Sequence, residues 1–451
     1  MRHTQLLFFV LFNLSAQFGL ISLAISAENT HLAETRSSDT SLVSVSQTNI
    51  SLDEATALAL QANPEIAMAI GSREIESGQV LQALTRPNPT LSGQIQDLRS
   101  QNRITSIIVS QQLETAGKRI KRIAAADATI AIADAEIRIA EAETSARVYG
   151  AFYQVLAAQQ AQALATDLLQ IATKSKETTA KRVLSGKVSP VEETKAKVAE
   201  ASLKVDLVNV NQQLIAAKKR LISLWGKGLV SAEAPTFTAV GDLDKISRLP
   251  ALSDLAMGLP NSPRSVKAGL LVNQKQALSA IEKSRQTPDV TVSLGAQRNQ
   301  ELGGLTQAII GLSVPIPLFD QNQGNFQSAK AREVQAQYEK TALENQLHTE
   351  LSIAYARWQS QIEAIATYSR DILPGAQSAY DAARKGFEFG KFSFLEVLDA
   401  QRTLFQTKTQ FIQTQALAHQ AEADIQSILG VTSTYQPLVE DIKKRNLYET
   451  K

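Results

Sequence analysis

The spacing of apolar residues predicts an unusually long helix in the first half of the chain. Between Lys118 and Ser185 there is no proline, and the only glycine is Gly150. Apolar side chains recur there at seven-residue intervals, as at Ile123 and Ile130, which is the repeat of packed helices. A helix over this stretch would be about 100 Å long, which exceeds an ordinary domain and requires partner helices in a bundle.

Further helices follow from the same pattern. The residues from Pro190 to about Trp225 form a second helix, with an apolar stripe that begins at Leu203. In the second half, helical sequence covers 325–386, with a kink or restart at Pro374, and then 393–429. Each half also starts with a leading helix, at 52–84 and at 252–284.

Between the leading helix and the long helix, each half changes to the two-residue period of β-strands. From 289 to 297, apolar and polar or small residues alternate strictly, and a second strand follows at 305–316. The first half has the counterparts 89–97 and 104–113. The sequence therefore predicts two β-hairpins, over about 89–113 and about 288–316.

The two halves are versions of one another. Pro89 and Pro288 are 199 residues apart, and Gly186 and Gly390 are 204 apart within a shared G-K-x-S-x-x-E-x-x-x-A pattern. We therefore divide the chain into a first repeat at 50–225, a linker at 226–250 and a second repeat at 251–430. The helical turns, or tips, are expected at about 183–190 and 387–393. The period near 200 is too long for a solenoid repeat.

The two ends of the chain have different compositions from the repeats. Residues 1–27 carry Arg2, an apolar run and small residues up to Ala27, which is typical of a secretory signal peptide. An uncleaved membrane anchor is the alternative interpretation. Residues 28–49 are polar and are expected to be extended or disordered. Residues 431–451 form a C-terminal tail.

Composition argues against several classes of function. Charged residues make up 20% of the chain and the net charge is only +2, so no nucleic-acid partner is indicated. Cysteine is absent, which excludes disulfides and thiolate sites. The four histidines and three methionines show no ligand spacing, so no metal site or cofactor is predicted. Without a phosphate-binding loop or a catalytic triad, we expect no enzyme activity.

Each predicted strand is long enough to cross a bilayer at a tilt, and one of its faces is apolar. Four strands cannot close a barrel, and open edges are not tolerated in lipid. If the strands span a membrane, several chains must therefore share one barrel. The alternative is a small soluble sheet that packs on the helices.

The order of elements, together with three local motifs, resembles the TolC-like outer-membrane efflux channels over about 50–430. The motifs "QQLETAGKRIKR" (111–122), "VPIPLFDQNQGN" (314–325) and "GKFSFLEVLDAQRTL" (390–404) resemble its metal-efflux branch, typified by cobalt–zinc–cadmium resistance channels. The fold class implied is mainly α with membrane β: two tandem repeats of helix, β-hairpin, long helix, turn and helix. In a homotrimer these would form a twelve-stranded outer-membrane barrel continued by a periplasmic α-helical barrel.

The resemblance also implies a location and partners. The chain would lie in the outer membrane of a Gram-negative bacterium, in contact with lipid, and extend into the periplasm. A periplasmic membrane-fusion adaptor and an inner-membrane RND-type pump would complete a tripartite system, and the pump would supply the energy. Export of heavy-metal cations such as cobalt, zinc and cadmium, or copper and silver, is the implied function. Two alternatives stay open: a duct for drugs or secreted polypeptides, and a soluble periplasmic coiled-coil scaffold.

The repeated turn has a local explanation in helix capping. Ser189 to Glu192 reads as a capping box with Pro190 at the first helical position, and Ser393 to Glu396 reads as the same box without proline. The glycine that precedes each box, Gly186 and Gly390, fits the left-handed residue that ends the previous helix. Each motif therefore predicts a helical hairpin.

The resemblance adds a functional interpretation to these turns. By position, Gly186, Lys187, Gly390 and Lys391 would meet the adaptor at the periplasmic tip. Three copies of Glu396 and Asp399, and of Glu192, would form rings of negative charge that attract cations. The alternative is that the glutamates only cap their helices.

The tip departs from the family pattern at two positions. The family's best-known multidrug member holds its tip shut partly with a tyrosine and an arginine, and Phe387 and Phe392 stand at those positions here. Neither side chain can make charged links. They are candidates for an apolar gate, or they simply pack between helices.

Overall fold

A computed structural model describes residues 49–97, 99–226 and 235–431 of the chain. The expected signal peptide, the polar segment up to residue 48 and the tail from residue 432 lie outside these described residues. Part of the expected linker, 227–234, also lies outside them.

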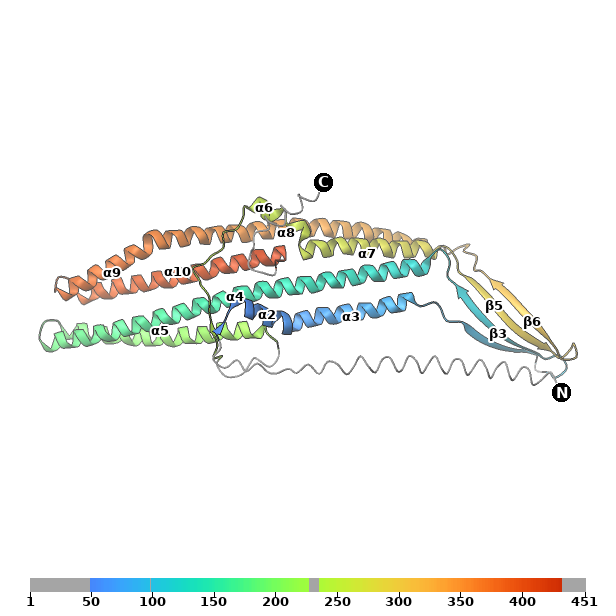
Figure 1. Cartoon of the computed structure of the whole chain (residues 1–451), viewed down its shortest axis with the longest axis horizontal. Helices are drawn as coiled ribbons and strands as arrows, with labels where there is room; N and C mark the ends of the chain where they lie inside the picture. Colours follow the sequence, from blue (N-terminus) through green and yellow to red (C-terminus); the bar gives the residue numbers. More distant parts are fainter. Residues whose placement is uncertain (1–48, 98, 227–234, 432–451) are drawn as a thin grey trace, which may run out of the picture. The chain divides into compact units, whose positions relative to one another are not determined.

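The first repeat has the predicted order of elements (Figure 1). Its elements are α2 (Leu52–Ala62), α3 (Pro64–Leu84), β2 (Thr90–Gln96), β3 (Ile104–Leu113), α4 (Lys118–Leu184) and α5 (Pro190–Ser223). The longest helix, α4, has 67 residues, in agreement with the proline-free stretch in the sequence.

The second repeat follows the same plan. Its elements are α6 (Leu252–Ala256), the 3₁₀ turn η1 (Leu259–Asn261), α7 (Pro263–Arg285), β5 (Val290–Asn299), β6 (Leu305–Ser313), α8 (Gln323–Thr367), the π-helical turn η2 (Tyr368–Ile372), α9 (Leu373–Glu388) and α10 (Phe394–Leu429). The predicted order of helix, hairpin, long helix, turn and helix is therefore confirmed in both halves.

Each leading helix is broken, where the sequence predicted one continuous helix. The breaks precede Pro64 and Pro263, which begin α3 and α7. In each case the residue before the proline is extended, because proline disfavours helical backbone there. Asn63 and Ser262 then cap the new helix through their side chains. Pro64 and Pro263 are 199 residues apart, as Pro89 and Pro288 are, so the break is a shared feature of the two repeats.

The kink predicted at Pro374 appears as a π-helical turn just before it. Proline has no N–H to donate to the carbonyl four residues earlier, so the backbone widens over η2 and restarts as α9. This turn separates α8 from α9 within one continuous helical path.

The two hairpins join into one antiparallel sheet of order β2-β3-β5-β6. The inner strands β3 and β5 pair along their full length, from Ile104 opposite Asn299 to Leu113 opposite Val290. A separate parallel pair links β1 (Asn49–Ile50) to β4 (Thr238–Ala239), so the start of the first repeat is tied to the linker.

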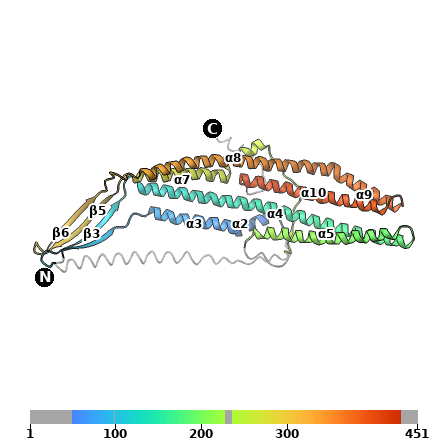
Figure 2. The same cartoon turned by 180° about the vertical axis from the view of Figure 1, so that it is seen from behind.

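The helices pack around α4, which contacts α3, α5, α7 and α10. Gly150 allows α10 to come close, since a Cβ there would lie 2.6 Å from the Gln420 side-chain oxygen. Figures 1 and 2 show the four-stranded sheet at one end of these helices and both helical turns, α4–α5 and α9–α10, at the other. The predicted membrane strands and the predicted tip residues thus lie at opposite ends of the bundle.

Candidate functional site

Both helical tips end their first helix with the same hydrogen-bond pattern. Gly186 and Gly390 are left-handed, with φ of 69° and 72°. The N–H of Lys187 donates to the Arg182 carbonyl at 2.9 Å, and the N–H of Lys391 donates to the Gly386 carbonyl at 2.7 Å. These six-to-one bonds define a Schellman motif, which glycine forms without a steric penalty.

The two tips begin their second helix differently, which corrects one detail of the sequence interpretation. Ser393 and Glu396 form the predicted capping box, with the Ser393 N–H donating to Glu396 Oε2 at 2.7 Å. Ser189 instead accepts from the N–H of Val191. The N–H of Glu192 donates to the Ser189 carbonyl at 3.0 Å, so no capping box forms there. One carboxylate oxygen of Glu192 is enclosed and has no hydrogen-bond partner among the described residues.

The tips touch each other through Arg182, a residue that the sequence did not single out. Its guanidinium donates to the Phe387 carbonyl at 2.9 Å and lies over the Phe387 ring, 4.4 Å from the centroid. Below this contact, Ala196 of α5 packs in one cluster with Phe387, Phe394 and further residues of α9 and α10. The two hairpins therefore share a small core at their tips.

The structure places the two candidate gate residues differently. Phe387 is only 8% exposed and packs against Phe394, with ring centroids 5.5 Å apart. Phe392 is 45% exposed and lies against Gly386, where a Cβ would come within 2.2 Å of its ring. Only Phe392 is thus available in a single chain to meet another surface.

The charged candidates at the tips lie on the surface. Lys187 and Lys391 are exposed on the turns, and Glu396 and Asp399 are exposed on the first turns of α10. Glu192 is half-buried on α5. The first four side chains could therefore reach a partner or a pore without rearrangement.

At the other end, the sheet has one apolar and one largely polar face. Strand pairing puts Leu91, Val109, Leu294 and Ile310 on the same face, because directly opposite residues share a face. All four side chains are exposed in the single chain. On the other face the Ser110 and Ser293 hydroxyls hydrogen-bond at 2.8 Å. A soluble sheet would bury its apolar face, whereas this one presents it outward.

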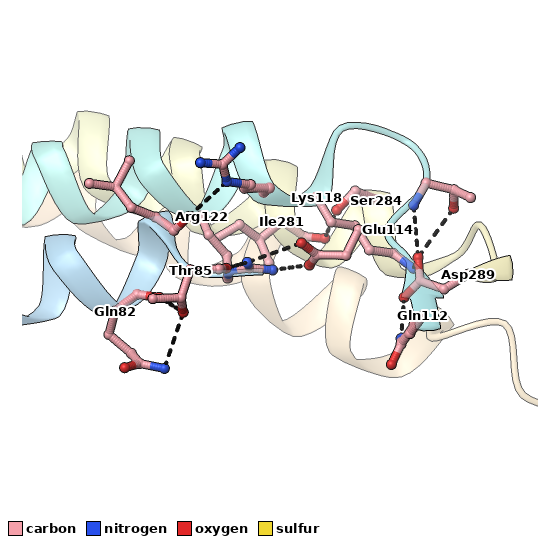
Figure 3. Close-up of polar contacts among 12 residues, drawn as sticks. Gln82, Thr85, Gln112, Glu114, Lys118, Arg122, Ile281, Ser284 and Asp289 are labelled. Carbon is pink, nitrogen blue, oxygen red and sulfur yellow. Dashed lines mark hydrogen bonds and ion pairs between the residues drawn. The ribbon is translucent and has the colours of Figure 1, made fainter. Parts of the chain in front are cut away.

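A polar corner joins the sheet to α4 (Figure 3). Asp289, just before β5, accepts from Lys118 at 2.6 Å, from the Thr115 N–H at 2.9 Å and from Gln112 at 2.9 Å. Arg122 pairs with Glu114 in the same region. This corner is made by the segment 111–122, so that motif fixes the start of α4 to the hairpin of the second repeat.

A buried polar group lies in the C-terminal half of α10, at a position that no local sequence pattern marks. His419 is fully buried, accepts from or donates to the Tyr149 hydroxyl at 3.1 Å and contacts the Leu243 carbonyl at 3.1 Å. Tyr153 stacks on its ring at 3.5 Å. Burial lowers the pKa of His419 to about 4 and raises the pKa of the neighbouring Glu422. These contacts hold the linker against α4 and α10.

The described residues contain neither a cluster of metal-ligating side chains nor a helix suited to cross a membrane. In the ranges 49–97, 99–226 and 235–431, no three histidine, aspartate or glutamate side chains gather where they could hold a metal ion. No helix within these ranges is long and apolar enough to cross a membrane.

The model of the outer membrane efflux protein family matches residues 55–227 and 257–431, one match for each repeat. The chain belongs to this family. The family prediction from the sequence motifs is thereby confirmed, and so is the function as an outer membrane efflux protein.

Relatives of this chain within the family are named for metal resistance or for cation efflux. The chain is 37% identical over 377 residues to the cobalt-zinc-cadmium resistance protein CzcC of Cupriavidus metallidurans, covering 83% of this chain and 89% of that protein. It is 25% identical over 292 residues to the cation efflux system protein CusC of Escherichia coli, covering 62% of this chain and 61% of that protein.

Solved structures share the fold of this efflux protein. A crystal structure of CusC superposes with a TM-score of 0.71 at 20% identity, covering 84% of this chain and 91% of that chain. The outer membrane protein VceC of Vibrio cholerae superposes with a TM-score of 0.69 at 21% identity, covering 84% and 96%. The predicted fold class is therefore confirmed.

Proposed function

We propose that this efflux protein works as a homotrimeric outer-membrane channel that exports heavy-metal cations. A periplasmic membrane-fusion adaptor docks at the helical tips, and an inner-membrane RND-type pump drives transport. The channel itself is a passive exit duct that extends from the outer membrane into the periplasm.

The main support for this proposal is the four-stranded sheet, which has one apolar face and one largely polar face. Its apolar face is exposed, and its outer strands β2 and β6 each have only one neighbour among the described strands. Lipid tolerates strands only in a closed barrel, because each unsatisfied backbone group there costs several kcal/mol. Three copies of four strands close such a barrel with the apolar side chains toward lipid.

The tips supply the opposite end of the duct. Glu396 and Asp399 are exposed close to the turn, so three copies would put six carboxylates around one mouth. Rings of carboxylates favour cations in channels. Lys187 and Lys391, exposed on the turns beside Gly186 and Gly390, would contact the adaptor.

The cargo is assigned from relatives named for metals. CzcC is named for cobalt, zinc and cadmium resistance, and a further relative, NccC of Alcaligenes xylosoxydans, for nickel, cobalt and cadmium. We infer that the substrate of this chain is a divalent cation of this group, or a copper or silver ion.

Deletion of the gene in its host tests the cargo, and fractionation of cells that contain the protein tests its location. We expect reduced tolerance to zinc, cobalt or cadmium, with unchanged tolerance to a panel of drugs and detergents. Complementation by the full chain should restore growth. Drug sensitivity with normal metal tolerance would assign the duct to drugs instead. Recovery of the protein in the soluble periplasm without detergent would favour a scaffold.

A further inference from the structure

The apolar face of the sheet ends in a row of polar residues near the turns between the strands. Arg298 on β5 is four residues after Leu294, so its side chain belongs to the same face. Thr105 on β3 and Thr306 on β6 lie directly opposite Arg298 and share that face, and all three side chains are exposed. The next row toward the helices is apolar on these strands and consists of Ile107, Ala296 and Ala308. Polar character on this face therefore begins at the row of Arg298.

A second arginine extends the polar row. The Gln300 N–H donates to the Arg103 carbonyl at 3.0 Å, which continues the pairing of β3 with β5 by one residue. Arg103 is two residues before Thr105, so the strand alternation directs it to the same face as Arg298. The two arginines are diagonal neighbours across the strands, about 7–8 Å apart, a spacing that long side chains can bridge.

Neither guanidinium has a partner in the part of the chain that the structure describes. Arg103 and Arg298 form no ion pair and no side-chain hydrogen bond there. The nearby Arg99, by contrast, pairs with Asp97 at 2.8 Å. Glu301, in the turn after β5, is exposed and pairs with neither arginine. Two positive charges are thus neighbours without a counterion from the described residues.

The turns lie at the end of the sheet that points away from the helices (Figures 1 and 2). Strand β5 leaves the helices at Val290 and ends at Asn299, one residue after Arg298. At about 3.4 Å per residue, Arg298 is roughly 27 Å along the strand from Val290, which is comparable with the apolar band of a membrane barrel, about 25 Å tall. In a channel whose helices extend into the periplasm, Arg298 therefore lies at the outer leaflet.

The lipid of that leaflet carries the complementary charge. The outer leaflet of a Gram-negative outer membrane is built from lipopolysaccharide, whose lipid A part is a phosphorylated diglucosamine with acyl chains. A guanidinium binds a phosphate through two parallel N–H···O bonds, which are strong because both groups are charged. A phosphate between Arg103 and Arg298 also relieves the repulsion of like charges on neighbouring strands.

We propose that Arg103 and Arg298, together with the hydroxyls of Thr105 and Thr306, bind a phosphate group of lipid A. The acyl chains of the same molecule then lie along the neighbouring apolar rows of the sheet. This inference rests on the proposed outer-membrane channel and adds to it a specific lipid site on the outward face.

Titration with purified bisphosphorylated lipid A tests the site. The lipid is added to the trimer of the full chain in mild detergent, after co-purified lipid has been washed away, and native mass spectrometry measures the bound fraction. We expect Arg103→Gln with Arg298→Gln to weaken binding roughly tenfold, because two charge-assisted contacts are lost. Each single variant should weaken binding about threefold, and the single variants replace the double variant if it fails to assemble.

The matched control removes the same charge from the same end of the sheet. Because Arg99 is already paired with Asp97, Arg99→Gln should change the affinity for lipid A by less than about twofold. Light scattering checks that each variant keeps the mass of the wild-type trimer.

Two competitors separate the possible sources of the phosphate. Inorganic phosphate lacks the acyl chains that contact the apolar rows, and phosphatidylglycerol carries a single phosphodiester charge. Neither should displace lipid A when present at an equal concentration. Displacement by inorganic phosphate would assign the arginines to free phosphate, and displacement by phosphatidylglycerol would assign them to anionic lipids in general. Either result would overturn the choice of lipid A.

The remaining outcomes separate this inference from the proposed function. Equal affinity of the wild type and the double variant, both as trimers, would overturn the lipid site and leave the channel standing. A wild-type protein that is soluble without detergent and monomeric would overturn both.

Discussion

At the level of single residues, the turn between α9 and α10 shows that two phenylalanines close in sequence can have different structural roles. Phe387 and Phe392 were equivalent gate candidates, but Phe387 fills the core shared by the two hairpins and Arg182 covers it. Phe392 stays exposed on the turn. An apolar gate made by three chains would therefore use Phe392, with Phe387 as its support.

The carboxylates of α10 should set the selectivity of the channel. We expect Glu396→Gln with Asp399→Asn to lower the cation-to-anion permeability ratio in single-channel recordings by roughly twofold or more, because the mouth loses six negative charges. Glutamine keeps the reach-back bond of the capping box, so trimers should persist. The matched control is Glu74→Gln with Glu76→Gln on α3. Unaltered selectivity would leave Glu396 and Asp399 as helix-capping and surface residues only.

His419 should make the protein sensitive to acid. Its pKa is lowered by burial from the usual 6.5 to about 4, so the folded state binds fewer protons than the unfolded state between these values. Stability is therefore lost as pH falls from about 6.5 to about 4, by at most about 3 kcal/mol. Glu422 acts in the opposite sense, because its pKa is raised.

The change His419→Gln tests this effect through the thermal midpoint of the detergent-solubilised protein. The variant should lose less stability than the wild type between pH 7.5 and pH 5, since glutamine does not titrate. His348→Gln, on an exposed position of α8, should follow the wild type. Parallel pH profiles for all three proteins would contradict a role for His419.

At the scale of elements, the sheet and its corner combine two different kinds of contact. The strands present apolar side chains on one face, whereas the corner to α4 is held by charged and polar groups around Asp289. This division places the strongly polar contacts at the ends of the strands that join the helices.

A charge on the apolar face should prevent insertion. We expect Leu294→Lys to reduce the amount of protein in the outer membrane several-fold, because a lysine near the middle of the bilayer costs about 2–4 kcal/mol on the lipid side of a barrel. The neighbouring change Ser293→Lys puts the same charge on the polar face and should be tolerated. Equal recovery of the two variants would contradict the assignment of the faces.

Loss of the corner ion pair should destabilise the junction. In Asp289→Asn, Lys118 loses its carboxylate partner in a site where both side chains are mostly buried, which should cost about 1–3 kcal/mol. The thermal midpoint in detergent measures this. The exposed pair of Arg370 and Asp371 provides the control, since Asp371→Asn should change stability by less than about 1 kcal/mol. Equal midpoints would show that the corner adds no stability.

At the level of the whole molecule, the duplicated order of elements suits an assembly of several chains. Each half contributes a hairpin to one end and a helical turn to the other (Figures 1 and 2). Three chains would then repeat one unit six times around an axis. The protein extracted in mild detergent should have the mass of three chains by light scattering, because a single sheet with two open edges cannot be stable in lipid. A monomer soluble without detergent would contradict this.

Much of the fold could be predicted from local patterns. The proline-free stretch, the two-residue alternation and the glycine before each turn marked α4, both hairpins and both tips, because these signals act between residues close in sequence. The broken leading helices were missed, although Pro64 and Pro263 share the 199-residue offset that marked the other repeat positions.

Local signals in the sequence specify the long helices, the hairpins, their duplication and the family, since periodicity, capping and turn chemistry act between neighbouring residues. Which of these elements meet follows from the packed structure alone. Three of these contacts join residues 170 or more positions apart. They are the pairing of β3 with β5, the contact of Arg182 with Phe387, and the contact of His419 with the Leu243 carbonyl. Such contacts depend on how whole helices and strands pack, which no local pattern specifies.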